Sequence, residues 1–178
     1  MTEFVTALLV QPWPHQSSRA EMDAFYGDPR GPGGNKVSPA WSKAFLVDVK
    51  SPWKMVFTAD NGKVSPIKKF SFNKMAAPSL ERVFDAIWEH YDKDQAAIEA
   101  RGLHQYGGAF NFRKIRGSSH ISNHAYACAL DLDPAHNPLG AKTGRMPAEV
   151  VTIFKSEGWR WGGDYVGRKD WMHFEAVR

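Results

Sequence analysis

One amphipathic helix constrains the fold of this chain more than any other feature of its sequence. Between residues 78 and 91, apolar side chains recur at i, i+3, i+4, i+7 and i+11, which is the spacing of one face of an α-helix. The residues on this face are Leu80, Val83, Phe84, Ile87 and Tyr91. Pro78 suits the first turn of such a helix. A helix with a single apolar face must pack on other elements, so those elements decide the class of fold.

Most of the remaining apolar runs are short, which favours strands. We expect five strands, at residues 44–50, 53–58, 63–72, 108–115 and 128–133. The turn signal Asp60-Asn61-Gly62 joins the second and third of them as a hairpin. The last stretch, residues 159–177, is predicted to form strand, loop and strand, and further helices are expected at residues 18–26 and 147–157. These elements predict an α+β fold with a small, mostly antiparallel sheet flanked by helices.

The length of 178 residues fits one compact domain, and a content of 43% hydrophobic residues is sufficient for a buried core. Residues 11–40 are rich in Pro, Gly and polar groups. We therefore expect residues 1–45 to form a loop-rich extension that packs on a domain of residues 46–178. The first ten residues have no basic segment, and their apolar run is too short to cross a membrane. We therefore expect synthesis in the cytoplasm without a signal peptide.

Cysteine content and charge limit the kinds of site that the chain can form. Cys128 is the only cysteine, which excludes an internal disulfide and a thiolate zinc cluster, so a metal site must use His and carboxylates. We expect Cys128 itself to be a small buried residue. The net charge of +4 suits an anionic partner such as nucleic acid, a membrane surface or cell-wall polymer. Because the Lys and Arg residues are scattered, we do not expect nucleic-acid binding.

Two segments, residues 118–133 and 158–175, concentrate the candidate ligands. Ligand atoms that share one zinc ion must lie within roughly 3–4 Å of each other, because each lies about 2 Å from the metal. His124 and Asp131 are seven positions apart, which is about 10 Å along a helix. The same separation is roughly 23 Å along a strand. They can share a metal only if the backbone folds back between them, and the small side chains between them would permit this close packing.

The first segment contains Ser122-x-His124-x-x-Ala127-x-Ala129-x-Asp131. It resembles the Ser-x-His-x-x-Gly-x-Ala-x-Asp signature of the zinc peptidase family of D-alanyl-D-alanine carboxypeptidases and L-alanyl-D-glutamate endopeptidases. The resemblance implies that His124 and Asp131 are two zinc ligands, with Asp133 as the alternative to Asp131. Ala127 departs from the family's glycine. If that position requires a positive φ, alanine costs about 1 kcal/mol there.

The second segment contains Asp170-Trp171-Met172-His173, which resembles the C-terminal motif of the same family. The resemblance implies that His173 is the third zinc ligand and that Asp170 is the catalytic base. The family also uses an arginine upstream of the first ligand to steady the scissile carbonyl oxygen or a substrate carboxylate. Arg113 fits this role best and Arg116 is the alternative. The implied fold is like that of hedgehog and D,D-peptidase domains.

Several neighbouring side chains have two open interpretations. His120 and His136 flank the motif and either contact substrate or lie exposed in loops. We expect Trp161, Asp164 and Trp171 to shape a substrate cleft. Packing in the core is the alternative for the two tryptophans.

The resemblance implies a Zn²⁺-dependent hydrolase that cuts the stem peptides of peptidoglycan. The segment Gly158-Trp-x-Trp-Gly-Gly-Asp164 and the later Met-His-Phe-Glu are similar to the endopeptidase branch, which includes phage endolysins. We therefore expect an L-Ala–D-Glu endopeptidase, with a D,D-carboxypeptidase or D,D-dipeptidase as alternatives. A non-catalytic, zinc-containing wall-binding domain is the alternative from another class. We also expect a monomer that reaches the cell wall after release or by another delivery route.

Overall fold

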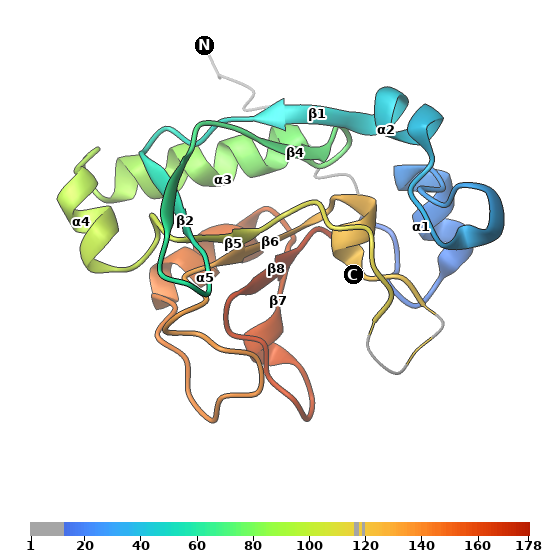
Figure 1. The fold of residues 1–178 in the computed structure, drawn as a ribbon. Helices are drawn as coiled ribbons and strands as arrows, with labels where there is room; N and C mark the ends of the chain where they lie inside the picture. The colour runs from blue at the N-terminus through green and yellow to red at the C-terminus, as the bar shows by residue number, and fades with distance from the viewer. Residues whose placement is uncertain (1–12, 116–117, 119) are drawn as a thin grey trace, which may run out of the picture.

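A four-stranded antiparallel sheet lies at the centre of the protein (Figure 1). The structure is a computed structural model that describes residues 13–115, 118 and 120–178. Across the sheet the strands follow the order β5 (Tyr106–Gly108), β6 (Ala129–Leu132), β8 (His173–Glu175) and β7 (Arg160–Trp161). Each neighbouring pair is antiparallel, as the sequence predicts. Side chains alternate along β6, so that Leu130 and Leu132 enter the core while Asp131 points to the opposite face.

Two short antiparallel pairs extend from this sheet. β1 (Leu46–Val49) pairs with β4 (Phe70–Asn73), and β2 (Met55–Thr58) pairs with β3 (Val64–Ile67). The sequence predicted one return strand over residues 63–72, and this prediction is wrong, because the segment divides into β3 and β4. Phe70 and Phe72 are buried whereas β3 is largely exposed. The chain bends between the two strands because these aromatic rings must enter the core.

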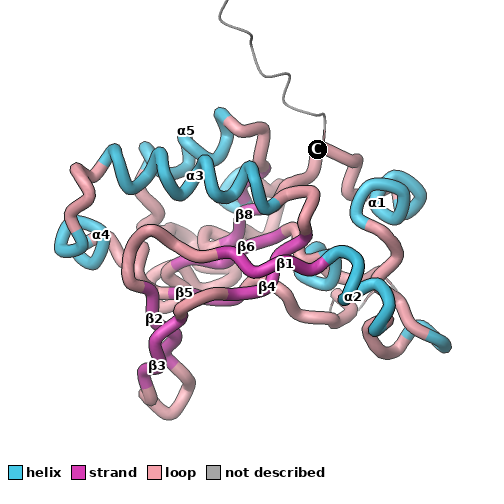
Figure 2. Tube along the Cα trace, turned by 90° about the horizontal axis from the view of Figure 1, so that it is seen from above, coloured by secondary structure: helices cyan, strands magenta, loops and turns pink. Residues whose placement is uncertain are grey.

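Helices α3 (Ala77–His90) and α5 (Ala148–Ser156) run along one side of the sheets (Figure 2). The predicted apolar face of α3 is confirmed, since Leu80, Val83, Phe84 and Ile87 are fully buried. The remaining helices are α1 (Arg19–Tyr26), α2 (Pro39–Phe45) and α4 (Gln95–Ala100), and the short 3₁₀ helices are η1 (Pro32–Gly34), η2 (Asn123–Tyr126) and η3 (Gly162–Asp164). Helices α2 and α4 were not predicted from the sequence. Both begin at a side-chain cap, Ser38 and Asp94, but are too short for an apolar period to be visible.

One hydrophobic core joins the elements, and buried residues from Trp13 to Val177 contribute to it. Phe174 of β8 stacks on Phe154 of α5 with ring centroids 3.9 Å apart. The Tyr26 hydroxyl of α1 donates a hydrogen bond to the Ala176 carbonyl at 2.5 Å. The architecture is therefore a single α+β domain, as the sequence predicts. In the described part of the chain, no helix is both long and apolar enough to cross a membrane.

A polar network fastens the segment after α1 to η2. The Tyr126 hydroxyl donates to Asp23 Oδ1 at 2.6 Å and accepts a hydrogen bond from Arg30 at 3.0 Å. Arg30 also pairs with Asp23 at 2.5 Å. Tyr126 is 3% exposed, and the side chains of Arg30 and Asp23 are 13% and 23% exposed, so this network is partly shielded from water.

Candidate metal centre

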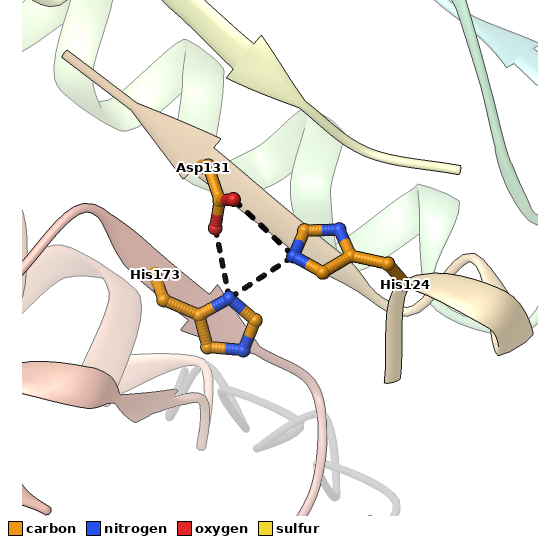
Figure 3. A group of neighbouring side chains, drawn as sticks. All are labelled: His124, Asp131 and His173. Carbon is orange, nitrogen blue, oxygen red and sulfur yellow. Dashed lines mark hydrogen bonds and ion pairs between the residues drawn. The ribbon is translucent and has the colours of Figure 1, made fainter. Parts of the chain in front are cut away.

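Three side chains from distant positions meet on the face of the central sheet opposite the core residues of β6 (Figure 3). His173 Nδ1 lies 2.8 Å from Asp131 Oδ1, and His124 Nε2 lies 3.3 Å from Asp131 Oδ2. The two ring nitrogens are 3.2 Å apart. One ligand atom from each residue lies within 4.8 Å of the other two, so the three side chains are arranged as a possible metal site.

Strand pairing and one unusual backbone conformation create this convergence. Asp131 and His173 are direct partners in the β6–β8 register. His124 lies in η2, and the chain reverses after it at Ala127, whose φ of 54° and ψ of 39° are left-handed. This reversal is the fold-back that the spacing of His124 and Asp131 requires. A left-handed alanine is disfavoured by about 1 kcal/mol, which explains why glycine suits this position.

The His124 ring is fixed by bonds on both sides of η2. The Ser122 hydroxyl accepts from the His124 backbone N–H at 3.3 Å. His124 Nδ1 lies 2.6 Å from the Ala109 carbonyl, which can only accept, so Nδ1 carries the proton. The other ring nitrogen, Nε2, faces Asp131 and His173.

The His173 ring is fixed in the same manner by a carboxylate. Its Nε2 lies 3.2 Å from Glu175 Oε2, so Nε2 donates and Nδ1 faces Asp131. Carboxylates and carbonyls behind metal-binding imidazoles commonly set the tautomer in this way. Two imidazole nitrogens and one carboxylate oxygen thus face a common point. This donor set fits zinc, which takes His and carboxylate ligands and leaves a position open in catalytic sites.

The charges in this cluster shift one another's titration. Burial lowers the pKa of His173, but hydrogen bonds with Asp131 and Glu175 outweigh it and raise the pKa to about 10. Burial raises the pKa of Asp131, yet hydrogen bonds from His124 and His173 hold it below its usual range. The pKa of Glu175 is lowered to about 2, because its bonds with His173 and other donors overcome burial. In the metal-free protein the negative charges of Asp131 and Glu175 therefore favour a positive charge on His173.

Asp170 lies beside the cluster and is partly buried. Its Oδ1 is buried and has no hydrogen-bond partner among the described residues. Burial raises the pKa of Asp170 above its usual value, and the negative charge of Asp131 adds to this, while His173 opposes it. A side chain at Gly162 would clash with the Asp170 backbone, so the glycine of η3 permits this position.

The structure places the predicted arginine in a loop. The sequence predicted a strand over residues 108–115, which is wrong, because β5 ends at Gly108 and only an isolated bridge joins Lys114 to Ile121. The register shifts between Tyr106 and Gly108, where φ reaches 136°, and the chain leaves the sheet. Arg113 is exposed, and its guanidinium makes no hydrogen bond or ion pair within the described part of the chain. Its carbonyl accepts from the Ser122 N–H at 3.0 Å. Arg116 lies outside the described residues.

The other candidates take structural or exposed positions. Asp133 is 2% exposed and bonds to His136 and Asn137, so it is not part of the cluster. Asp133 and His136 instead line a pocket of about 650 Å³ to which none of the three clustered residues contributes. His120 is exposed.

The two tryptophans are half-buried, and each is held by a hydrogen bond from its ring. Trp161 Nε1 donates to the Trp171 carbonyl at 3.0 Å, and Trp171 Nε1 donates to the Ala141 carbonyl at 2.8 Å. Asp164 is an exposed residue that pairs with Lys155 at 2.6 Å. Cys128 is fully buried, as expected.

Glu175 is a functional candidate that the sequence analysis missed. It lies two positions after His173 in β8, so both side chains point to the same face of the strand. This spacing in the Met-His-Phe-Glu segment is the signal that could have found it.

Comparison with known proteins gives one family match. A family model described as D-alanyl-D-alanine carboxypeptidase matches residues 116–176. The matched segment contains η2, β6, β8 and Asp170, which are the parts that carry the resemblance in the sequence. The match supports that family and, with it, a hydrolase that cleaves peptide bonds. No solved structure matches the chain.

Proposed function

We propose that this protein is a zinc peptidase that hydrolyses peptide bonds in the stem peptides of peptidoglycan, with the L-Ala–D-Glu bond as its preferred cut. The observation that carries the proposal is the convergence of His124, Asp131 and His173, whose ligand atoms lie within 4.8 Å of one another. Both histidines are buried, and each has its second ring nitrogen engaged by a carbonyl or carboxylate. The match of residues 116–176 to a carboxypeptidase family supports the same reading.

Zinc bound by these three residues would supply Lewis acidity, which lowers the pKa of water and polarises a carbonyl group. In our proposal Asp170 is the base that takes a proton from the attacking water and passes it to the leaving amine. A raised pKa suits this role, because a stronger base accepts the proton more readily and the acid formed can still release it.

We assign to Arg113 the role of steadying the scissile carbonyl oxygen or a substrate carboxylate. Its backbone is joined to the start of η2 through Ser122, so its position is tied to that of His124. Its guanidinium is exposed and therefore available to a ligand. Replacement of Arg113 by Gln should lower kcat/KM roughly 10²–10³-fold if it acts on the oxyanion. A normal rate in this variant would transfer the role to Arg116.

The decisive variant for catalysis is Asp170→Ala. We expect kcat to fall roughly 10²–10⁴-fold, the usual contribution of a general base, while one zinc ion per chain remains bound. Asp48→Ala is the control, because Asp48 is an exposed carboxylate of β1 that pairs with Lys69 and takes no part in the candidate site. Full turnover in the zinc-loaded Asp170→Ala protein would remove Asp170 from the mechanism.

The bond that is cut is determined from the products of digested cell wall. Cleavage of L-Ala–D-Glu creates a new D-Glu amino terminus, which mass analysis after amine labelling detects. The description of the matched family favours a second candidate, a D,D-carboxypeptidase, which would instead release free D-alanine from pentapeptides. A D,D-dipeptidase would split only free D-Ala-D-Ala. A zinc-loaded protein that binds wall and produces none of these products would be a non-catalytic binding domain.

The substrate of the proposed enzyme lies in the cell wall. Action as a monomer, and arrival at the wall after release or by another route, stay predictions. Sedimentation of the zinc-loaded protein would test the first of them.

A further inference from the structure

The carboxylate of Glu175 is buried at the centre of a polar cluster behind the metal centre. Glu175 is 1% exposed. Its Oε2 receives hydrogen bonds from Asn123 Nδ2 at 2.6 Å and from His173 Nε2 at 3.2 Å. Its Oε1 receives one from the Tyr165 hydroxyl at 2.6 Å, and Arg160 Nη1 lies 3.7 Å away. One carboxylate therefore holds groups from four separate segments of the chain.

Glu175 is too deeply buried to contact a substrate directly. The distances to its partners also differ from those of an ordinary structural ion pair. The arginine among its partners, Arg160, is the most distant of the four groups. The closer contacts lead towards the metal centre. His173 is one of the three candidate ligands, and Asn123 directly precedes another, His124, in η2.

We propose that Glu175 is a positioning residue that orients both histidines of the metal centre, His173 directly and His124 through Asn123. The inference rests on the proposed metal site. The carboxylate accepts from His173 Nε2 and so directs Nδ1 of that ring towards Asp131. The same oxygen accepts from Asn123, which fixes the start of η2, where the second ring is attached.

Replacement by glutamine tests this role sharply, because all four groups around the carboxylate are donors. A glutamine side chain has the same shape but offers one acceptor oxygen and one NH₂ donor. With the NH₂ at the Oε2 position, the bonds from His173 and Asn123 are lost. With the NH₂ at the Oε1 position, the Tyr165 hydroxyl must turn and accept, and in both orientations the negative charge that strengthens the bond from His173 is lost. The loss should appear in zinc affinity, since replacement of groups that orient metal ligands typically weakens metal binding about 10–100-fold.

The experiment measures the zinc dissociation constant of the full chain by competition with a chromogenic chelator. Glu175→Gln should bind zinc 10–100-fold more weakly than the wild type. Its Co²⁺-substituted form should show a shifted visible absorption spectrum, which a purely structural residue would not change. The control is Glu157→Gln, because Glu157 is a partly buried carboxylate with its own bonds to Arg82 and Ser79. The control should bind zinc within twofold of the wild type.

Tyr165→Phe provides a second variant that removes one bond to Glu175 and keeps the carboxylate. Its zinc affinity should lie between those of the wild type and Glu175→Gln, and it decides the question if Glu175→Gln does not fold. Wild-type zinc affinity and cobalt spectra in folded Glu175→Gln, or equal weakening in the Glu157→Gln control, would overturn the inference. Zinc binding by the wild type without cleavage of wall peptides would instead refute the proposed function and leave the role of Glu175 intact.

Discussion

The hydroxyl of Tyr126 provides a test of how much the polar network between the N-terminal part of the chain and η2 stabilises the fold. Tyr126 lies in η2, two positions after His124, and its hydroxyl joins Asp23 at 2.6 Å and Arg30 at 3.0 Å. Tyr126→Phe removes this one oxygen and keeps the ring, which is 3% exposed. The variant therefore isolates the polar network from the packing around it.

The size of the effect follows from the partners of the hydroxyl. A hydrogen bond to a charged group contributes about 1.5–3 kcal/mol, and the variant loses one such bond from each of two charged partners. Asp23 and Arg30 still pair with each other after the change, so neither charge is left alone. We therefore expect a total loss well below the sum of two such bonds, about 2 kcal/mol in the free energy of unfolding. For a chain of this size the melting temperature should fall by roughly 4–8 °C.

The assay is urea unfolding of the metal-free protein, followed by circular dichroism, together with the melting temperature from calorimetry. Tyr91→Phe is the matched control, since its hydroxyl bonds at 2.8 Å to Glu149, whose side chain is 38% exposed. The control should lose less than about 1 kcal/mol, because water can replace the lost bond at this exposed carboxylate. Equal losses in the two variants would refute the reasoning, because the buried network would then contribute no more than a bond at the surface.

Three further predictions concern the metal, pH and the backbone. Zinc at 100 times its dissociation constant should stabilise the protein by about 2.7 kcal/mol, or roughly 5–11 °C in melting temperature. A chelator should reverse this shift, and His173→Ala should show none. The metal-free protein should be most stable between pH 4.5 and 6.5, as measured by the urea midpoint. The contribution of Glu175, whose pKa falls from 4.5 to about 2, is complete above pH 4.5 and lost as the pH falls through 2. Folding raises the pKa of His173 from 6.5 to about 10, so the stabilisation that His173 contributes is complete below pH 6.5 and lost as the pH rises through 10. A urea midpoint that keeps rising above pH 8 would contradict this prediction. Ala127→Gly should change the free energy of unfolding by less than about 0.5 kcal/mol. The change relieves the strain of a left-handed alanine, about 1 kcal/mol, but it also removes one buried methyl group, which contributes about 0.8 kcal/mol. Ala127→Val should destabilise by more than about 1 kcal/mol in the same urea assay, since a β-branched residue rarely adopts positive φ.

The elements that the sequence predicted well are those whose local pattern and tertiary burial agree. The face of α3 is an example, because the spacing of Leu80, Val83, Phe84 and Ile87 is repeated in their full burial. The prediction of one strand over residues 63–72 failed because the two halves of this segment pair with different strands. A local sequence pattern contains no information about the pairing partner. The prediction of a strand over residues 108–115 failed because the chain leaves the sheet at Gly108, whose φ is 136°.

The metal centre was only partly predictable from the residues themselves. Spacing alone could not bring His124 and Asp131 together, because the reversal depends on the backbone of Ala127, a residue with no intrinsic preference for positive φ. The family resemblance selected the three residues. The role of Glu175 required the structure, because its partners come from separate segments of the chain, and Asn123 lies 52 positions before it.

The direct pairing of Asp131 with His173 in β6 and β8 determines which parts of the chain can change in length and which cannot. Insertion of a single residue within either strand would exchange its inward and outward faces, so that a ligand would enter the core and a leucine or phenylalanine would replace it at the centre. The loops of the connection between the two strands are under no such constraint, because the ladder of hydrogen bonds holds Asp131 beside His173 whatever the length of these loops. Residues 138–145 and 166–169 could therefore be lengthened, shortened or exchanged to adapt the proposed enzyme to different substrates while the two strands keep their register.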